Sequence, residues 1–200
     1  MQTRRGRLRN AYSCDMRRLI GITMPEFENA DLERETIVSL LDSGRLEFFH
    51  LRKPSFSERD MELWLEAFPV RLRERLCLQD CIGLANAFGL GGVHLNKRNG
   101  GMAPAGFRGR ISYGCHSLEE VQQMKPKADY VFLSPIFDSI SKQGYKSKFS
   151  KDELREAARK GVIDERVFAL SGIDERKFEE LEEMGFSAAA LMGSLWRNVK

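Results

Sequence analysis

Hydroxyl and ammonium groups that could hold an anion are concentrated in residues 134–142, which read SPIFDSISK. This segment follows the apolar run YVFL at 130–133, so its polar side chains come where a buried strand would end. Ser139 and Ser141 can donate hydrogen bonds to phosphate oxygens, and Lys142 adds a mobile positive charge. We therefore predict that these three residues bind phosphate, the alternative being a solvated turn.

Glycine and serine follow two later apolar runs, at residues 167–170 and 188–192. Ser171 and Gly172 come after the first run, and Gly193 and Ser194 come after the second. Glycine allows backbone N–H groups to approach an anion closely. We predict that these four residues complete the phosphate site, the alternative being glycines that only turn the chain.

All three histidines, His50, His94 and His116, lie at or just beyond the ends of predicted strands. His116 directly precedes Ser117, a predicted helix N-cap, where the positive end of the helix favours a neutral ring that can accept a proton. His116 is therefore the predicted catalytic residue. Zinc bound by the three imidazoles is an alternative, and packing is the expected role of His94.

A repeated pattern of strands and helices has to position these side chains. Short apolar runs predict eight strands, at residues 19–22, 46–51, 76–78, 92–95, 110–113, 130–133, 167–170 and 188–192. Their alternation with helical segments predicts a parallel sheet, and 200 residues that are 42% hydrophobic can bury a full core. We predict the α/β class and a single-domain (β/α)8 TIM barrel. Its last helix should be short or missing, because the chain ends soon after residue 192.

Helices are indicated by one apolar stripe and two capping boxes. Met61, Trp64, Leu65 and Phe68 recur at the spacing of one helical face, which favours a core role over a cofactor site. The segments SLEE at 117–120 and SKDE at 150–153 predict helix starts in which serine and glutamate exchange hydrogen bonds with the backbone.

The positive charge of the chain is concentrated at its start. Residues 1–18 contain six arginines and one acid, so their +5, subtracted from the total of +3, leaves −2 for the remainder. We expect residues 1–17 to be a basic, flexible extension, and residues 18–200 to form the barrel. The remainder lacks the clustered basic stripe that is typical of proteins that bind nucleic acid, so we expect no nucleic-acid partner.

Targeting and cysteine patterns favour a cytoplasmic protein. No window approaches ~18 consecutive apolar residues, so we expect no membrane partner. The arginine-rich start lacks the apolar region of a secretory signal, although an organellar transit peptide is an alternative. The four cysteines, Cys14, Cys77, Cys81 and Cys115, show no paired metal-binding spacing and fit a reduced compartment.

Six segments in order resemble the thiamin phosphate synthase and TenI family across about residues 18–195. They are HLRK at 50–53, QD at 79–80, GVHL at 92–95, CHSLEE at 115–120, SPIF at 134–137 and ALSGI at 169–173. The resemblance implies a barrel enzyme of thiamin biosynthesis that acts on a thiazole phosphate, a small-molecule substrate. It leaves the oligomeric state open.

Several positions depart from the synthase pattern of this family. The resemblance implies a magnesium ion on two acids, and Asp80 matches only one of them. Asn99 stands where the second acid is expected, and Lys97 replaces a glutamine. Pro54 replaces a basic residue, with Lys53 one place earlier.

These departures favour the TenI branch, whose implied activity is thiazole tautomerase, a proton shift that aromatises thiazole carboxylate phosphate. His116 matches the acid/base histidine of that branch, and a proton shift needs no metal cofactor.

Two alternatives remain. Thiamin phosphate synthase would join an aminopyrimidine diphosphate to thiazole phosphate and release pyrophosphate. It would use magnesium at Asp80, with His50, Arg52, Lys53 and Gln79 on the pyrimidine and diphosphate side. A catalytically silent, phosphate-binding regulatory barrel is the other alternative.

Overall fold

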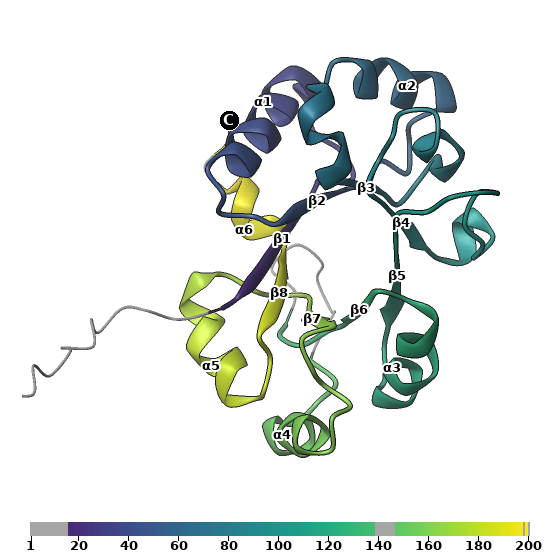
Figure 1. Ribbon diagram of the computed structural model, residues 1–200. Coiled ribbons are helices and arrows are strands. Elements are labelled where there is room, and N and C mark those ends of the chain that lie inside the picture. The colour runs from purple at the N-terminus through teal and green to yellow at the C-terminus, as the bar shows by residue number, and fades with distance from the viewer. Residues whose placement is uncertain (1–15, 139–146, 198, 200) are drawn as a thin grey trace, which may run out of the picture.

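Eight parallel strands close into a barrel in the computed structural model, which describes residues 16–138, 147–197 and 199. The strands are β1 (Arg18–Ile22), β2 (Phe48–Leu51), β3 (Leu76–Leu78), β4 (Gly92–Leu95), β5 (Arg110–Cys115), β6 (Tyr130–Leu133), β7 (Val167–Ala169) and β8 (Ala188–Leu191). Each strand pairs with the next along the chain, and β8 pairs with β1 (Figure 1). The predicted α/β barrel is therefore confirmed.

Side chains of the strands alternate between the barrel interior and the layer beneath the helices. In β6, Tyr130 and Phe132 join the interior cluster, whereas Val131 and Leu133 join the cluster shared with the helices. Both faces are buried, as expected for a parallel strand that is covered by crossover helices. This explains why the strands appear in the sequence as short, continuously apolar runs.

The interior of the barrel combines large aromatic side chains with small ones. The rings of Phe48 and Phe168 lie 5.3 and 5.2 Å from that of Tyr130, measured between centroids. Ala188 and Ala190 of β8 complete this cluster. Alternating large and small residues lets the side chains fill the closed barrel without voids.

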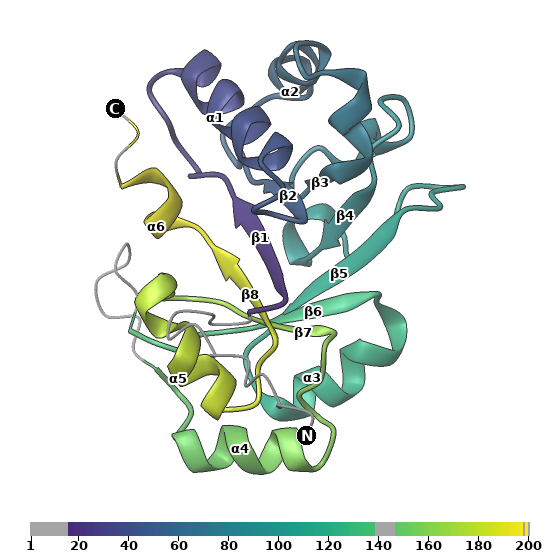
Figure 2. The same cartoon turned by 60° about the vertical axis from the view of Figure 1, so that its left-hand side comes forward.

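Helices surround the strands on the outside (Figures 1 and 2). They are α1 (Ala30–Asp42), α2 (Glu58–Glu66), α3 (Leu118–Met124), α4 (Lys151–Arg159), α5 (Phe178–Glu183) and α6 (Gly193–Trp196). Neighbouring helices α4 and α5 are joined by an ion pair of 2.8 Å between Lys151 and Glu180. Among the described residues, no helix is long and apolar enough to cross a membrane.

Two crossovers use 3₁₀ turns where the repeating pattern predicts helices. Only η2 (Ile82–Ala85) follows β3, and only η3 (Lys97–Asn99) follows β4. Both crossovers contain glycines with positive φ, such as Gly89 and Gly100, which weaken helix formation. Three further 3₁₀ segments are η1 (Val70–Arg75), η4 (Lys125–Lys127) and η5 (Glu175–Lys177).

The apolar stripe of α2 packs into the core as predicted. Met61, Trp64, Leu65 and Phe68 are all at most 5% exposed, although Phe68 lies just past the end of the helix. The aromatic residues contact each other edge to face, with 5.2 Å between the ring centroids of Trp64 and Phe68. The helix begins at Ser57, which forms a capping box with Asp60 that the sequence analysis did not predict.

One predicted capping box is complete and the other is half formed. Ser150 and Glu153 exchange both hydrogen bonds at the start of α4. At α3, Ser117 accepts from the N–H of Glu120, but the Glu120 carboxylate accepts from the N–H of His116 instead of Ser117. The prediction for residues 117–120 is therefore corrected, because the glutamate reaches one residue further back.

The last helix, α6, has four residues, in agreement with the predicted short or missing helix. It is anchored by Trp196, whose indole N–H donates to the Ile22 carbonyl at 3.0 Å. Near the start of the described chain, Met16 packs into the core, and the Arg17 N–H donates to the Ser187 carbonyl. Most of the predicted extension, residues 1–15, lies outside the described residues.

Candidate functional site

A cavity of about 920 Å³ opens at the carboxyl ends of the strands. Its floor is formed by interior side chains at the top of the barrel, among them Ile22, His94 and Phe132. Its walls are the loops that follow the strands, which is where barrel enzymes carry their active sites. Predicted site residues from five different strands therefore face one space: Arg52, Gln79, His116, Ser171, Gly172, Gly193 and Ser194.

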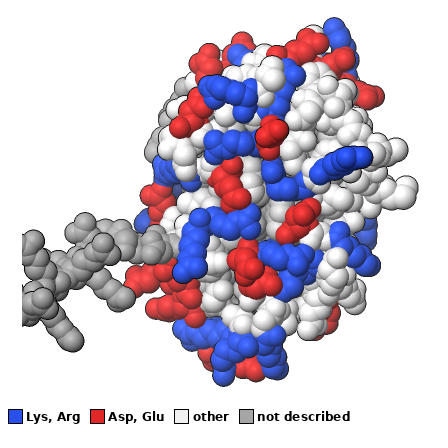
Figure 3. Space-filling model, viewed as in Figure 1, with Lys and Arg blue, Asp and Glu red and all other residues white. Residues whose placement is uncertain are grey.

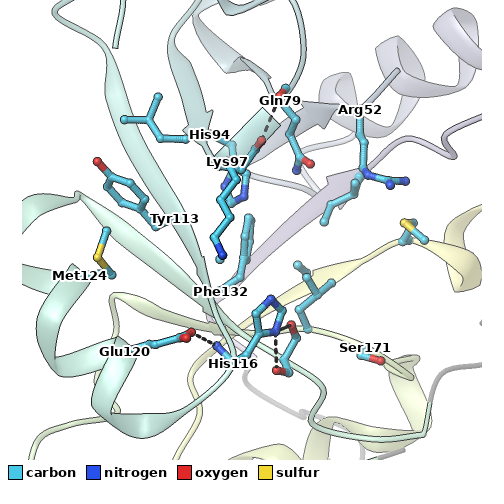
Figure 4. A pocket seen from close by; sticks show the side chains of 18 of the residues that line it. Arg52, Gln79, His94, Lys97, Tyr113, His116, Glu120, Met124, Phe132 and Ser171 are labelled. Carbon is cyan, nitrogen blue, oxygen red and sulfur yellow. Dashed lines mark hydrogen bonds between the residues drawn. The ribbon is translucent and has the colours of Figure 1, made fainter. Parts of the chain in front are cut away.

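His116 follows β5 and is held through both its backbone and its ring (Figure 4). Its Nδ1 lies 3.1 Å from the Ser134 carbonyl oxygen and 3.3 Å from the Ser134 hydroxyl. The carbonyl can only accept, so a hydrogen on Nδ1 satisfies the shorter contact. The backbone N–H of His116 donates to Glu120 Oε2 at 2.6 Å. The unprotonated Nε2 is then the nitrogen that can accept a proton within the cavity.

The other two histidines belong to the barrel interior. His50 is fully buried, accepts at Nδ1 from the Gln79 amide and has Nε2 2.6 Å from the Tyr130 hydroxyl. His94 lies at the cavity floor, with Nδ1 2.9 Å from the Ser112 hydroxyl. Burial lowers the pKa of His50 well below its ordinary value, and burial together with Arg98 lowers the pKa of His94 to about 3.

His94, a buried ring with a lowered pKa and a hydrogen bond to Ser112, thus fits the packing role expected for it. Among the described residues, no group of three or more His, Cys, Asp or Glu side chains is arranged to hold a metal ion.

The loop after β7 adopts an unusual backbone conformation. Ser171 and Gly172 have φ values of +88° and +67°. A side chain at Gly172 would come within 2.4 Å of the Asp138 carbonyl oxygen, so only glycine fits this close approach. The Ser171 hydroxyl donates to the Phe137 carbonyl at 3.2 Å. Strained backbone of this type clusters at functional sites.

The loop after β8 adds Gly193 and Ser194 to the same side of the cavity. The Ser194 hydroxyl is buried and has no hydrogen-bond partner among the described residues, which leaves it available to a ligand. Ser139, Ser141 and Lys142 lie outside the described residues, so their predicted role in phosphate binding stays a prediction.

Lys53 does not line the cavity. Its ammonium is buried against Glu33 at 2.6 Å and donates to the Met24 carbonyl at 3.0 Å. The rings of Trp64 and Phe56 lie within 6 Å of the same ammonium. The Lys53 side chain therefore connects the loop after β2 to α1 and α2. His50, another residue predicted for the diphosphate side, does not line the cavity either.

Three cationic side chains form one wall of the cavity: Arg52 after β2, and Lys97 and Arg98 after β4. Figure 4 shows Lys97 extended into the cavity toward Phe132 and His116. Burial lowers the pKa of the Arg52 guanidinium, and the nearby Arg98 lowers it further. We refer to these three residues as the cationic wall.

Asp80 and Asn99 are the positions at which the family pattern implies a metal. Asp80 Oδ1 is paired with Arg98 Nη2 at 3.1 Å, and its Oδ2 accepts from the Lys53 N–H at 3.0 Å. The Asn99 amide donates to the His94 carbonyl at 2.8 Å, and its oxygen accepts from the Asn96 N–H at 2.9 Å. One paired carboxylate and one fully engaged amide do not fit a magnesium ion, which prefers free oxygen ligands.

Two contributors to this site were missed from the sequence. Ser134, which orients His116, was included in residues 134–142 and in a family segment but was given no role of its own, and Arg98 was not singled out. The signal for Arg98 is present in the sequence, since KR at 97–98 begins two residues after a predicted strand end. Its partner Asp80 could not be inferred from that signal.

On the face shown in Figure 3, acidic and basic side chains are interspersed. Among the residues that the structure describes, no single large basic patch covers this face.

The fold and the cavity define a (β/α)8 barrel enzyme with its site at the carboxyl ends of the strands. A family model described as thiamine monophosphate synthase matches residues 19–195, and the chain belongs to this family. The resemblance expected from the sequence is thereby confirmed.

Individual relatives agree with this assignment. A solved structure described as thiamine phosphate pyrophosphorylase from Bacteroides thetaiotaomicron is 36% identical, covers 92% of this chain and 86% of that one, and has a TM-score of 0.80.

Thiamine-phosphate synthases of Actinobacillus succinogenes and Caldicellulosiruptor saccharolyticus are 27% and 24% identical over 60% and 87% of this chain. The matched region spans 57% of the Actinobacillus protein and 81% of the Caldicellulosiruptor protein.

Proposed function

We propose that this protein is a thiamin phosphate synthase, which joins an aminopyrimidine diphosphate to a thiazole phosphate. The departures from the synthase pattern favoured the tautomerase, with the synthase as the alternative. The names of the relatives reverse this preference, because they are synthases and a pyrophosphorylase. The tautomerase becomes the second candidate.

The observation that carries the proposal is a cavity with two different sides that suit anions. The cationic wall, Arg52, Lys97 and Arg98, lines one side. Ser171, Gly172, Gly193 and Ser194 lie on the loops after β7 and β8, where barrels commonly bind phosphate. Two such regions in a space of about 920 Å³ suit two phosphorylated substrates better than one.

The reaction requires little acid/base chemistry from the protein. The thiazole nitrogen attacks the methylene carbon of the pyrimidine, and the bond from that carbon to the diphosphate oxygen breaks. Pyrophosphate leaves with the bonding electrons, so the nitrogen becomes positively charged. The protein has to align the two substrates and stabilise the departing anion, which are effects of positioning and fixed charge.

The side chains present suit these two tasks. The cationic wall would stabilise the charge that grows on the leaving pyrophosphate. The Ser171 and Ser194 loops would hold the thiazole phosphate on the other side, so that its nitrogen is directed at the pyrimidine. His116 would position the ring between these two regions through Nε2.

The direct test is to incubate the purified protein with thiazole phosphate and aminopyrimidine diphosphate, with magnesium present. We expect thiamin phosphate and pyrophosphate to form in equal amounts. Arg52→Ala should slow the reaction, whereas Arg59→Ala, an exposed ion-paired arginine on α2, should not. Absence of product with both substrates at saturation would exclude the synthase.

The second candidate, thiazole tautomerase, is favoured by the geometry of His116. A neutral ring with Nδ1 committed to the Ser134 carbonyl presents Nε2 as a base, as a proton shift requires. The experiment is to follow aromatisation of the thiazole carboxylate phosphate by its ultraviolet absorbance. Rapid aromatisation without pyrimidine would support this candidate.

A further inference from the structure

The cationic wall offers a way to neutralise a diphosphate that does not depend on a metal. We infer that Arg98, together with Arg52 and Lys97, binds the diphosphate directly, with a guanidinium taking the place of the magnesium ion. The inference rests on the proposed function for the identity of the ligand. It goes beyond that function, because it concerns how this chain replaces a metal that its residues do not fit.

Arg98 already occupies the acid that would bind the metal. Asp80 is only 12% exposed at its side chain, and its two oxygens are taken by the Arg98 guanidinium and the Lys53 N–H. A magnesium ion would have to displace a positive charge to reach this carboxylate, and it gives up its own waters reluctantly.

The amide of Asn99 is engaged as well. Its Nδ2 donates to the His94 carbonyl at 2.8 Å and to the Gln79 carbonyl at 3.3 Å, so the donor side of the amide is engaged with the backbone. Its Oδ1 accepts from the N–H groups of Asn96 and Gly101. The asparagine is used to shape the turn after β4, not to present a free ligand.

The charge that remains is positive. Arg52, Lys97 and Arg98 supply three positive charges and Asp80 one negative, which leaves a net +2 on this side of the cavity. Among the described residues, the Arg52 guanidinium and the Lys97 ammonium have no hydrogen-bond or ion-pair partner. Guanidinium groups match phosphate oxygens in pairs, and two arginines with one lysine can contact both phosphates.

The conformation of the turn supports this role for Arg98. Asn96 Oδ1 accepts from the N–H groups of Arg98 and Asn99 at 2.8 and 3.3 Å, which fixes the backbone of η3. Arg98 is thereby directed toward Asp80, which lies after the neighbouring strand β3. Its guanidinium is held at the cavity before any ligand binds, and such preorganisation lowers the cost of binding an anion.

The experiment is calorimetric titration of the purified protein with inorganic pyrophosphate, in EDTA and again in excess magnesium. We expect pyrophosphate to bind in EDTA. Arg98→Ala should weaken this binding about 10- to 100-fold, the usual effect of losing hydrogen bonds between charged groups. The pyrophosphate affinity of Arg98→Lys should lie between that of the unaltered protein and that of Arg98→Ala, because lysine keeps the charge and loses the paired geometry.

Arg59→Ala is the matched control. Arg59 is also an exposed arginine in an ion pair, 66% exposed against 53% for Arg98, but it lies on α2 outside the cavity. Its loss should leave pyrophosphate affinity unchanged. Thermal unfolding of each variant establishes that the fold is retained.

Two results would overturn the inference. One is pyrophosphate binding that is absent in EDTA and appears with magnesium, which would make Asp80 a metal ligand after all. The other is an Arg98→Ala variant that binds pyrophosphate in EDTA as tightly as the unaltered protein.

The proposed function is tested separately by thiamin phosphate formation. If pyrophosphate binds without metal through Arg98 and no thiamin phosphate forms, the inference stands and the proposed function fails. If thiamin phosphate forms only with magnesium and pyrophosphate needs the metal to bind, the proposed function stands and the inference fails.

Discussion

At the scale of single residues, His116 is defined by what its two ring nitrogens contact. The Ser134 carbonyl fixes the hydrogen on Nδ1, so Nε2 is the nitrogen that meets a ligand. In the proposed synthase reaction this nitrogen would position a ring, and in the tautomerase reaction it would take a proton. Replacing His116 should therefore lower the reaction rate by different amounts in the two cases.

Replacing His116 with Asn separates these two roles. Under the proposed synthase reaction no proton is taken by this ring, so His116→Asn should lower the rate of thiamin phosphate formation by less than about 10-fold. A general base would cost about 10² to 10⁴ in rate. Initial rates with saturating substrates measure this difference, and a loss of 10³ would contradict the positioning role.

Asn99 is a second residue whose role depends on its amide. Asn99→Asp would remove two donated hydrogen bonds and place a carboxylate oxygen against the His94 and Gln79 carbonyls. We expect the free energy of unfolding to fall by about 1 to 3 kcal/mol, the cost of losing these hydrogen bonds to partly buried carbonyls. Urea unfolding measures this change.

Asn29→Asp is the control for that substitution. Asn29 caps α1 by accepting from the Leu32 N–H, a task that aspartate performs equally well. The free energy of unfolding of Asn29→Asp should differ from that of the unaltered protein by less than about 0.5 kcal/mol. Equal stability of Asn99→Asp and the unaltered protein would show that the turn after β4 does not need the amide.

At the scale of elements, the short crossovers after β3 and β4 shape the cavity. A full helix after β4 would begin where η3 now holds Lys97 and Arg98. Asn96 caps the start of η3, and the left-handed Gly100 ends it after three residues. The sequence between residues 96 and 109 thus places cations at the cavity instead of building an outer helix.

Helix α2 provides a stability test within one element. Met61 is fully buried on its inner face, whereas Leu63 is 48% exposed. We expect Met61→Ala to lower the free energy of unfolding by about 2 to 5 kcal/mol, because it leaves a cavity in the core.

Leu63→Ala should change stability by less than about 0.5 kcal/mol, since leucine and alanine are both good helix formers and little burial is lost. Denaturant unfolding of the two variants compares them directly. Similar losses for both would mean that α2 does not pack through the predicted face.

At the scale of the whole molecule, the barrel interior contains two neutral histidines. The rings of His50 and His94 lie 5.7 Å apart within the barrel, and the pKa of each ring is lowered, chiefly by burial. The unfolded chain binds protons on these rings near pH 6.5, whereas the folded chain does not. Stability therefore falls as the pH drops below about 6.5.

We also predict how steeply the free energy of unfolding falls with pH. Between pH 6 and 5, each histidine should contribute a decrease approaching 1.4 kcal/mol per pH unit in the free energy of unfolding. His94→Gln should reduce the slope by about the contribution of one proton. Leu63→Ala, which changes no titrating group, should leave the slope unchanged. An unaltered slope in His94→Gln would mean that this ring is not kept neutral by the fold.

The sequence by itself determined the strands, the stripe of α2, the short last helix and the family. These features depend on periodicity and on residues only a few positions apart, such as the alternating side chains of YVFL at 130–133. The segment around His116 was also found without a structure, because its position at a strand end and before a cap is local.

Only the tertiary structure decided which charges meet. Lys53 was expected on the diphosphate side and turns instead to the buried Glu33. Asp80, a predicted metal ligand only under the synthase alternative, pairs with Arg98, 18 residues further along the chain. Neither pairing follows from local spacing, because each depends on how closure of the barrel brings separate loops together and on which side chains remain accessible to a ligand.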